Sequence, residues 1–253
     1  MDRSWLESFL ACPEFQGMGH GQTLPDVNLG LGWIYYGLCR ALRPRRIVCI
    51  GSHRGFVPIL FARALQDNLD DGHILFVDPS FVDDFWKDQA AVRAHFEKFD
   101  AGNIEHHCLT TQDFVASHNF ACLGAVDFLF VDGFHTAEQA RFDHEAFIPK
   151  LSPRHLVFFH DSLSDNLSTL YGEDKKYRFS VFEYVDELKA SGQYQVLDMN
   201  VEHGLSIVRS NSEGGLGSNF KCNTRSPKGI GCCDGQTKQA PQQRGTWRDF
   251  RRA

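Results

Sequence analysis

Apolar runs of strand length alternate with amphipathic stretches of helix length along most of the chain. Residues 47–50 are four apolar residues in a row, bounded by Arg45-Arg46 and Gly51, which is typical of a strand buried on both faces of a parallel sheet. Apolar residues recur at helical spacing from 56 to 65. Strand, glycine loop and helix would form half of a nucleotide-binding unit. An ordinary turn between strand and helix explains the two loop glycines equally well.

The same alternation continues beyond this first unit. Further strands are predicted at 73–78, 104–109, 126–133 and 156–161, and helices at 29–42, 88–99, 114–120, 137–148 and 179–189. This order predicts an α/β fold with a Rossmann-like, doubly wound, mostly parallel sheet. Residues 194–199 and 204–209 predict two late strands joined by a short turn, which must pair as an antiparallel closing hairpin.

The pattern divides the chain into three parts. Residues 1–27 combine a short helix at 5–11 with a loop rich in Gly, His and Pro that would suit a lid. Residues 28–209 carry the alternating elements of the α/β domain. From 210 to 253 hydrophobic periodicity disappears and Gly, Ser, Asn, Gln and Pro dominate, which predicts a disordered, polar, basic tail.

Composition narrows the class of protein further. The 253 residues suffice for one domain with a sizeable core, and 42% hydrophobic against 23% charged residues indicate a packed globular body. Eight Lys and Arg fall after residue 209, so the body holds 18 basic and 29 acidic residues, which argues against nucleic acid as a partner. No apolar run approaches the length of a membrane span and no signal peptide is recognisable, so we expect a cytoplasmic protein without a membrane partner. The eight Cys are scattered without a CxxC pair, which favours free thiols. The sequence is compatible with a homo-oligomer but does not predict one.

Polar residues stand at the end of every predicted parallel strand. They are Gly51 and Ser52, Asp78, Thr110 and Thr111, Asp132, and His160 with Asp161. The carboxyl ends of parallel strands meet at one sheet edge, where open α/β folds bind their ligands. Gly51 and Gly55 permit positive φ and close backbone approach to a polar ligand. Asp78 stands 27 residues after Gly51, where an acidic residue binds ribose hydroxyls, although a solvent-facing Asp fits the position equally well.

The last two strand ends offer the ligands of a hard divalent cation. Asp132 and Asp161, assisted by His160 or His135, supply carboxylate oxygens and an imidazole, and Mg²⁺ or Mn²⁺ fits this set best. In the alternative, Asp132 hydrogen-bonds a cofactor and Asp161 caps the next segment. His135 could also act as a general base, because imidazole titrates near neutrality.

Two segments, 126–139 (VDFLFVDGFHTAEQ) and 151–161 (LSPRHLVFFHD), resemble class I S-adenosylmethionine-dependent methyltransferases. More narrowly, they resemble the bacterial group of small-molecule and sugar O-methyltransferases and cephalosporin-hydroxylase-like proteins. The resemblance covers about residues 28–209, including the closing hairpin. Two residues depart from the family pattern: Cys49 replaces the acidic residue of the first strand, and His53 replaces the central glycine of the loop.

The resemblance implies S-adenosylmethionine as the cofactor. Gly51, Ser52, His53 and Gly55 would surround its methionine part, Asp78 its ribose, Thr111 and Gln112 its adenine, and Asp132 would also contact it. Metal-dependent members of the family place cation ligands at the positions of Asp132, His160 and Asp161. Asp132, His135 and His160 are then the candidate catalytic residues.

The expected reaction is methylation of a hydroxyl on a small-molecule acceptor, such as a natural product or sugar. Residues 13–28 and 163–178 would form the acceptor site. Three alternatives remain: an NAD-dependent oxidoreductase, which would need GxGxxG where this chain has GxxxG, a hydroxylase-like enzyme, and a non-catalytic binding protein.

Overall fold

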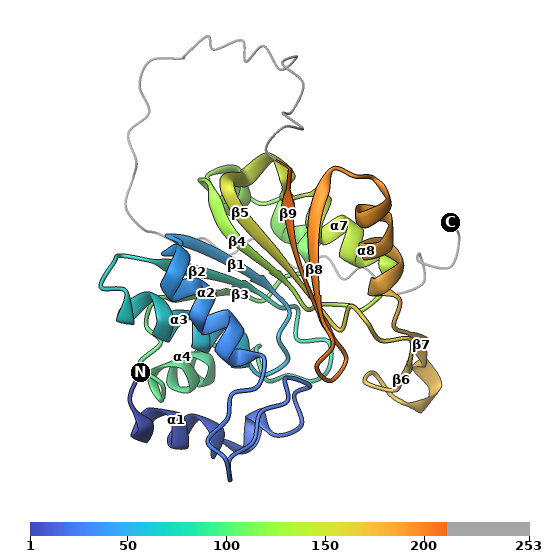
Figure 1. Ribbon diagram of the computed structural model, residues 1–253. Helices are drawn as coiled ribbons and strands as arrows, with labels where there is room; N and C mark the ends of the chain where they lie inside the picture. Colours follow the sequence, from blue (N-terminus) through green and yellow to red (C-terminus); the bar gives the residue numbers. More distant parts are fainter. Residues whose placement is uncertain (212–253) are drawn as a thin grey trace, which may run out of the picture. The chain divides into compact units, whose positions relative to one another are not determined.

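A computed structural model describes residues 1–211 of the chain, so the predicted tail lies almost entirely outside the described residues. A seven-stranded sheet with the order β3-β2-β1-β4-β5-β9-β8 forms the centre of this part (Figure 1). Its strands are β1 (Arg46–Ile50), β2 (His73–Val77), β3 (Ile104–His107), β4 (Val126–Val131), β5 (Leu151–His160), β8 (Tyr194–Met199) and β9 (Leu205–Ser210). β1 to β5 pair in parallel, and β9 pairs antiparallel with β5 and β8. The predicted sheet with its antiparallel closing hairpin is therefore confirmed.

Helices cover both faces of the sheet and divide the core into two layers. Their bounds are α1 (Arg3–Leu10), α2 (Gly32–Leu42), α3 (Phe56–Asp67), α4 (Gln89–Glu97), α5 (Thr111–Val115), α6 (His118–Ala121), α7 (Ala137–Glu145) and α8 (Val181–Ala190), with 3-10 turns η1 (Pro13–Phe15), η2 (Ile148–Lys150) and η3 (Glu173–Lys175). In one layer, helices α1, α2, α3 and α4 pack on one face of the sheet. In the other layer, helices α5, α6, α7 and α8 pack on the opposite face. Burial of apolar side chains on both faces explains the continuous apolar runs of β1, β2, β4 and β5, whereas the edge strand β3 has none.

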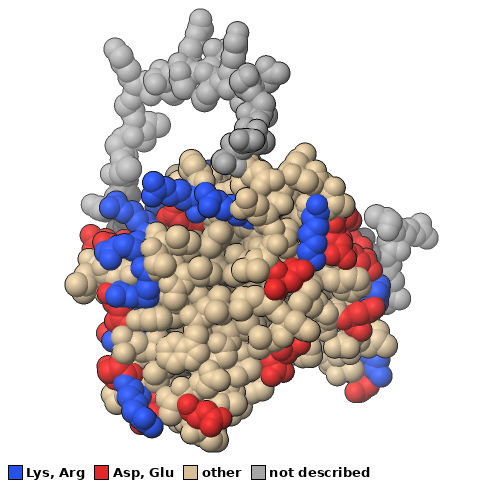
Figure 2. All heavy atoms as spheres, viewed as in Figure 1, with Lys and Arg blue, Asp and Glu red and all other residues tan. Residues whose placement is uncertain are grey.

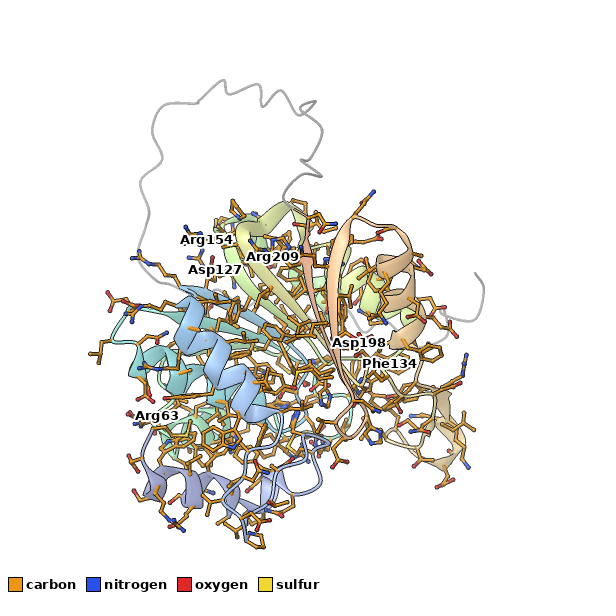
Figure 3. The ribbon with its side chains drawn as sticks, viewed as in Figure 1. Arg63, Asp127, Phe134, Arg154, Asp198 and Arg209 are labelled. Carbon is orange, nitrogen blue, oxygen red and sulfur yellow. The ribbon has the colours of Figure 1, made fainter. Side chains whose placement is uncertain are left out.

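The two ends of the sheet have different roles. At the amino end, the Asp127 carboxylate accepts hydrogen bonds from the backbone N–H groups of Arg45 and Arg46, at 2.8 and 3.2 Å. Asp127 is the second residue of β4, and Phe134 follows the end of that strand. Figure 3 shows the two residues at opposite ends of the sheet. The carboxyl ends of β1, β2, β4 and β5 therefore share the edge near Phe134, where sequence analysis places the ligand.

Two predicted elements need correction, and one segment without a predicted element forms a hairpin. The helix expected at 114–120 is two short helices, α5 and α6, because the Ser117 side chain caps the second by accepting from the Phe120 N–H at 3.3 Å. Strand β5 starts at Leu151 instead of 156, with a register irregularity between Val126 and Phe128 on its neighbour β4. Residues 163–178, for which no helix or strand was predicted, contain a hairpin of β6 (Leu167–Ser168) and β7 (Tyr177–Arg178).

The surface of the described part shows no single dominant charge on the face in Figure 2. Basic and acidic side chains are interspersed around its rim, and mostly uncharged residues occupy its centre. No helix among residues 1–211 is both long and apolar enough to cross a membrane.

Candidate active site

The loop after β1 packs directly on the turn after β4. Gly51 has φ +69°, and a Cβ built on it would lie 2.1 Å from the carbonyl oxygen of Asp132. The Gly51 N–H donates to Val77 O at 2.9 Å, and the Asp132 N–H donates to Ile50 O at 2.8 Å. The ends of three strands are thus joined by backbone contacts, which leave no room for a side chain at position 51.

Neighbouring side chains hold the rest of this loop in place. Trp86 Nε1 donates to the carbonyl oxygen of His53 at 2.7 Å, and His95 Nε2 lies 2.9 Å from the carbonyl oxygen of Arg54. The Arg54 guanidinium pairs with the Asp83 carboxylate. His53 has φ +47°, a left-handed conformation that is uncommon outside glycine. These contacts favour one conformation of a loop whose sequence alone would leave it mobile.

Asp78 follows β2 beside this loop with one oxygen still available. Its Oδ1 accepts a hydrogen bond from the Ser80 N–H at 2.7 Å. Burial raises the pKa of Asp78 to about 6, with a smaller contribution in the same direction from Asp132. A half-buried carboxylate with free acceptor capacity fits a pair of ribose hydroxyls, as expected from its position.

The end of β3 belongs to a hydrogen-bonded network that sequence analysis missed. Gln112 Nε2 donates to Gln139 Oε1 at 2.9 Å, and Gln139 Nε2 donates to Asp143 Oδ1 at 2.7 Å. Asp143, on α7, is only 1% exposed. The hydroxyl of Thr111 also contacts its carboxyl group and lowers its pKa. An acidic residue at a position of α7 that faces the sheet was the available signal, since such residues are almost never fully buried without partners.

Asp132, His135, His160 and Asp161 converge at the ends of β4 and β5. His160 Nδ1 lies 3.0 Å from Asp132 Oδ1 and 3.1 Å from Asp161 Oδ1. His135 Nδ1 lies 3.4 Å from Asp161 Oδ2. All four residues are buried except Asp132, which is partly exposed, so the structure brings together every predicted catalytic and metal-binding residue.

The charges of this cluster depend on each other. Burial alone would lower the pKa of His160, but Asp132 and Asp161 outweigh this effect and hold the pKa well above its usual value. Burial would raise the pKa of Asp161, but His160 and His135 reverse the shift and hold it below its usual value. A histidinium between two carboxylates is the state that these contacts favour.

The donor set fits a divalent cation, with one change from the sequence-based expectation. Asp132, His135 and Asp161 each offer a ligand atom, and the three atoms lie within 4.8 Å of one another. His160 was the predicted third ligand, but its Nδ1 faces the two carboxylates and orients them. Two carboxylates and one imidazole suit Mn²⁺ or Mg²⁺, and hydrogen bonds to ligand oxygens are a common second layer of such sites.

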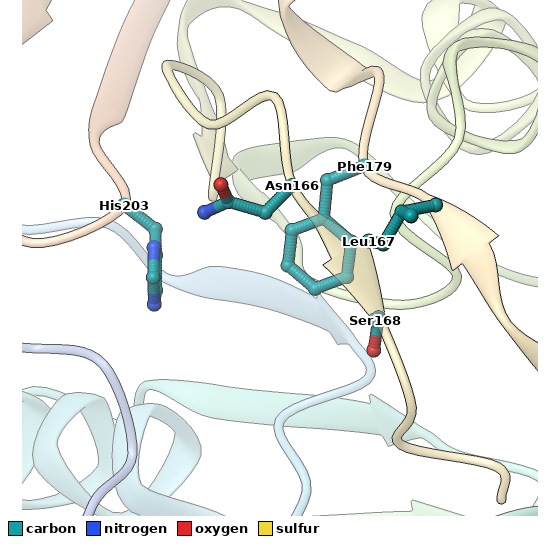
Figure 4. Close-up of a pocket in the computed structure, with 5 residues that line it drawn as sticks. All are labelled: Asn166, Leu167, Ser168, Phe179 and His203. Atoms are coloured by element: carbon teal, nitrogen blue, oxygen red, sulfur yellow. The ribbon is translucent and has the colours of Figure 1, made fainter. Parts of the chain in front are cut away.

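An aromatic cluster and two cavities adjoin these residues. Phe134 stacks on Tyr177 with ring centroids 4.4 Å apart, and His135 contacts Phe179 at 4.4 Å. A cavity of about 380 Å³ is lined by Asn166, Leu167, Ser168, Phe179 and His203. Figure 4 shows His203 and Phe179 on opposite sides of it. A second cavity of about 200 Å³, lined by Gly17, Gly19, Gly21, Gln22, Glu202 and His203, shares His203 with the first. Both cavities therefore use segments that were expected to form the acceptor site.

Comparison with known proteins finds a match to a methyltransferase domain. Residues 48–162 match the family model of the methyltransferase domain. The chain is 31% identical over 186 residues to the uncharacterized protein y4gI of Sinorhizobium fredii, an alignment that covers 70% of this chain. The chain spans only 19% of that relative's length.

Solved structures share the fold at low sequence identity. A Bacillus cereus O-methyltransferase in complex with S-adenosylhomocysteine has a TM-score of 0.58 and 16% identity, with 83% of this chain and 92% of that chain covered. The SAH-bound Podospora anserina methyltransferase PaMTH1 has a TM-score of 0.56 and 16% identity, with 82% and 86% covered. The Streptomyces achromogenes O-methyltransferase TomG, in complex with S-adenosylmethionine, has a TM-score of 0.55 and 16% identity, with 83% and 91% covered.

The described part therefore has the fold of class I methyltransferases, and its residues 48–162 match a methyltransferase domain. More particularly, its fold is that of the O-methyltransferases just described. The narrower resemblance to cephalosporin-hydroxylase-like proteins stays a prediction.

Proposed function

We propose that the protein transfers the methyl group of S-adenosylmethionine to a hydroxyl oxygen of a small-molecule acceptor, with a divalent cation held beside the acceptor. The observation that carries the proposal is the grouping of Asp132, His135 and Asp161 within 4.8 Å at the sheet edge that also holds the Gly51 loop. The names of the Bacillus and Streptomyces structures support oxygen as the methylated atom.

The cofactor would lie across the carboxyl ends of β1, β2 and β4. Gly51, Ser52, His53 and Gly55 would contact its methionine part, and Asp78 its ribose. Thr111 and Gln112 would flank the adenine, and Asp132 would stand between cofactor and acceptor. When bound, the cofactor supplies a methyl group already activated by the sulfonium charge.

The protein must then align the acceptor oxygen with that methyl group and remove its proton. Asp132 and Asp161 would hold a cation that lowers the pKa of the acceptor hydroxyl. His135, whose Nδ1 is 3.4 Å from Asp161, is in reach of the same space and would accept the proton. Alignment contributes much of the rate, because a correctly placed nucleophile avoids the entropic cost of the encounter. The cofactor would supply the methyl group to the acceptor oxygen, and His135 would take up the proton that this oxygen loses.

The acceptor would enter through the cavities that meet at His203. Asn166, Ser168 and His203 offer polar groups, while Phe179 and Leu167 offer an apolar wall. This mixture fits a hydroxylated compound with one apolar face. A panel of simple phenols and monosaccharides, assayed by formation of S-adenosylhomocysteine, would distinguish the two acceptor classes.

Isothermal titration calorimetry with S-adenosylhomocysteine is the first test of the proposal. We expect one site per chain with a dissociation constant in the micromolar range, which is common for cofactor products. NADH provides the comparison for an oxidoreductase. Tight NADH binding without S-adenosylhomocysteine binding would contradict the proposed reaction.

Cofactor binding should weaken at acidic pH. The pKa of Asp78 is raised to about 6, so its carboxylate becomes protonated as the pH falls through this value. If the ionised form accepts both ribose hydroxyls, affinity for S-adenosylhomocysteine falls roughly tenfold per pH unit below the pKa. Calorimetry between about pH 5 and pH 8 would measure the slope. Asp78→Asn should bind weakly at every pH, and an unchanged slope in this variant would assign the titration to another group.

Removing the cation should lower methyl transfer while leaving cofactor binding intact. Asp161→Ala deletes one of the two carboxylates proposed to hold the cation, and we expect the rate to fall about 100-fold, a loss typical of a damaged metal site. Mn²⁺ should raise the unfolding temperature of the natural protein but not of this variant. Asp186→Ala, an exposed acid on α8, is the control. Full activity in EDTA would remove the cation from the mechanism and leave methyl transfer in place.

A further inference from the structure

Asp143 is a buried carboxyl group to which neither the reaction nor the family match assigns a role. It lies on the side of α7 that faces the sheet, and only 1% of it is exposed. From it, two hydrogen bonds run outward through the half-buried Gln139 to the exposed Gln112. Gln112 is the second residue of α5, just after the end of β3, on the proposed adenine side of the cofactor site.

The donor and acceptor groups of Asp143, Gln139 and Gln112 fix the direction of these hydrogen bonds. An ionised carboxylate can only accept, so Gln139 must turn its Nε2 toward Asp143. The other end of the same amide, Oε1, then faces Gln112 and can only accept. Gln112 must therefore donate its own Nε2 to Gln139, and its Oε1 is left facing outward. One buried charge thus decides which atom of an exposed amide is offered to a ligand.

We infer that Asp143, acting through Gln139, orients the Gln112 amide so that its carbonyl oxygen faces the base of the cofactor. Gln112 then accepts a hydrogen bond from the exocyclic amino group of adenine and disfavours a base with a carbonyl at the same position. Asp143 is a positioning residue for base recognition. The inference rests on the proposed function, which places adenine beside Thr111 and Gln112.

Burial shields the contact with Gln139 from water, but it also disfavours the ionised carboxylate on which the orientation depends, so the orientation holds above the pKa of Asp143. A carboxyl group at this depth loses its hydration, and burial raises the pKa of Asp143 to about 7 in spite of the opposing contacts from Thr111 and Gln139. A well-packed apolar residue would serve the core without that cost. Because the position is enclosed, water competes weakly for Gln139, and the 2.7 Å contact is short for a hydrogen bond between nitrogen and oxygen.

A pair of probes that differ only at the base tests the inference. S-Adenosylhomocysteine carries the amino group, and S-inosylhomocysteine carries a carbonyl in its place. Calorimetry at about pH 8, above the pKa of about 7, keeps Asp143 ionised. We expect the natural protein to prefer the adenosyl compound by about tenfold or more, because a mismatched polar pair costs at least about 1 kcal/mol.

Asp143→Asn is the decisive single variant. Asparagine has nearly the same shape, but its amide can donate or accept. It therefore no longer imposes one direction on the hydrogen bonds through Gln139 to Gln112. The preference should fall toward equality while S-adenosylhomocysteine still binds. Gln139→Leu breaks the chain at a less buried position and should have the same effect if Asp143→Asn folds poorly.

A double variant, Asp143→Asn with Gln139→Glu, should restore the preference. The amide introduced at position 143 can donate to the carboxylate introduced at position 139, and this carboxylate can again only accept from Gln112 Nε2. The direction at Gln112 is the natural one, so the roughly tenfold preference should return. Glu138→Gln, an exposed neighbour on α7, is the matched control and should keep the natural preference.

The outcomes separate the inference from the proposed function. If the natural protein binds neither probe, the proposed function fails and takes the inference with it. If it binds and prefers S-adenosylhomocysteine, but Asp143→Asn and Gln139→Leu keep the full preference, the inference alone is overturned. Loss in the single variants with recovery in the double variant supports it, because a merely structural defect would not be repaired by a second change.

Discussion

Gly51→Ala is expected to abolish binding of S-adenosylhomocysteine and to lower the free energy of unfolding by about 3 kcal/mol or more. The new Cβ would lie 2.1 Å from the carbonyl oxygen of Asp132 and 2.7 Å from the Cα of Gly133. Both contacts are with backbone, which cannot rotate away as a side chain can. The left-handed conformation at φ +69° adds about 1 kcal/mol of strain for any residue with a Cβ. Urea unfolding and calorimetry with S-adenosylhomocysteine would measure the two effects.

Gly37→Ala is the matched control for this prediction. Gly37 lies inside α2, and a Cβ on it would meet nothing within 4 Å. Because alanine is the better helix former, this variant should gain about 0.5–1 kcal/mol and bind the cofactor product normally. If Gly51→Ala instead keeps the natural stability and affinity, the loop after β1 does not pack on the turn after β4 as described.

The organisation of the sheet edge could be predicted because it depends on local sequence signals. Apolar runs marked four of the five parallel strands, β1, β2, β4 and β5, and these ended at polar residues such as Asp78, Asp132 or His160. In a parallel sheet those ends must share one edge, so their proximity followed without knowledge of the strand order. The closing hairpin followed equally directly, because a short turn permits only antiparallel pairing.

The contacts within the site could not be predicted, because they join residues without periodicity. Sequence analysis offered His160 or His135 as the imidazole ligand, and only side-chain orientation separates them: His160 Nδ1 lies between two carboxylates, while His135 belongs to the group of three candidate ligands. The partners of Asp143 are similarly hidden, since Thr111 belongs to a different element and Gln139 looks like an ordinary helix surface residue. Tertiary contacts decide such roles.

The N-terminal segment shows how contacts extend a sequence-based prediction. Residues 1–27 were expected to form a helix and a lid-like loop. His20 from this loop stacks on Phe56 with ring centroids 4.6 Å apart, and its ring lies 4.4 Å from that of His160. The segment therefore shields the buried side of the histidine that pairs with Asp132 and Asp161. Whether it also opens for the acceptor stays a prediction.

His160→Phe is expected to be the most destabilising change at the ends of β4 and β5. Phenylalanine keeps a planar ring but removes the positive charge that lies 3.0 Å from Asp132 and 3.1 Å from Asp161. Two carboxylates then face each other with little solvent, and losing one partner of a buried ion pair typically costs about 3–5 kcal/mol. A divalent cation should recover part of this loss, because it would replace the missing charge between the same carboxylates.

The pH dependence of the stability loss in His160→Phe would identify the positive charge of His160 as its cause. The pKa of His160 is raised in the folded state, so its stabilisation is fully present below the unfolded value of about 6.5 and is lost as the pH rises through the folded value. The pKa of Asp161 is lowered, so its contribution is present above about pH 4 and is lost as the pH falls. The stability difference between natural protein and variant should therefore be largest between about pH 4 and pH 6.5. Urea unfolding across this range measures it.

His73→Phe gives the comparison that separates burial from pairing. His73 also lies beside a carboxylate, with Nε2 3.3 Å from Glu105 Oε2, but both side chains are about half exposed. An exposed pair contributes about 1 kcal/mol or less, so this variant should lose little stability at any pH. Equal losses in the two variants would mean that the aromatic packing around His160, with His20 on one side, stabilises the site more than its charge does.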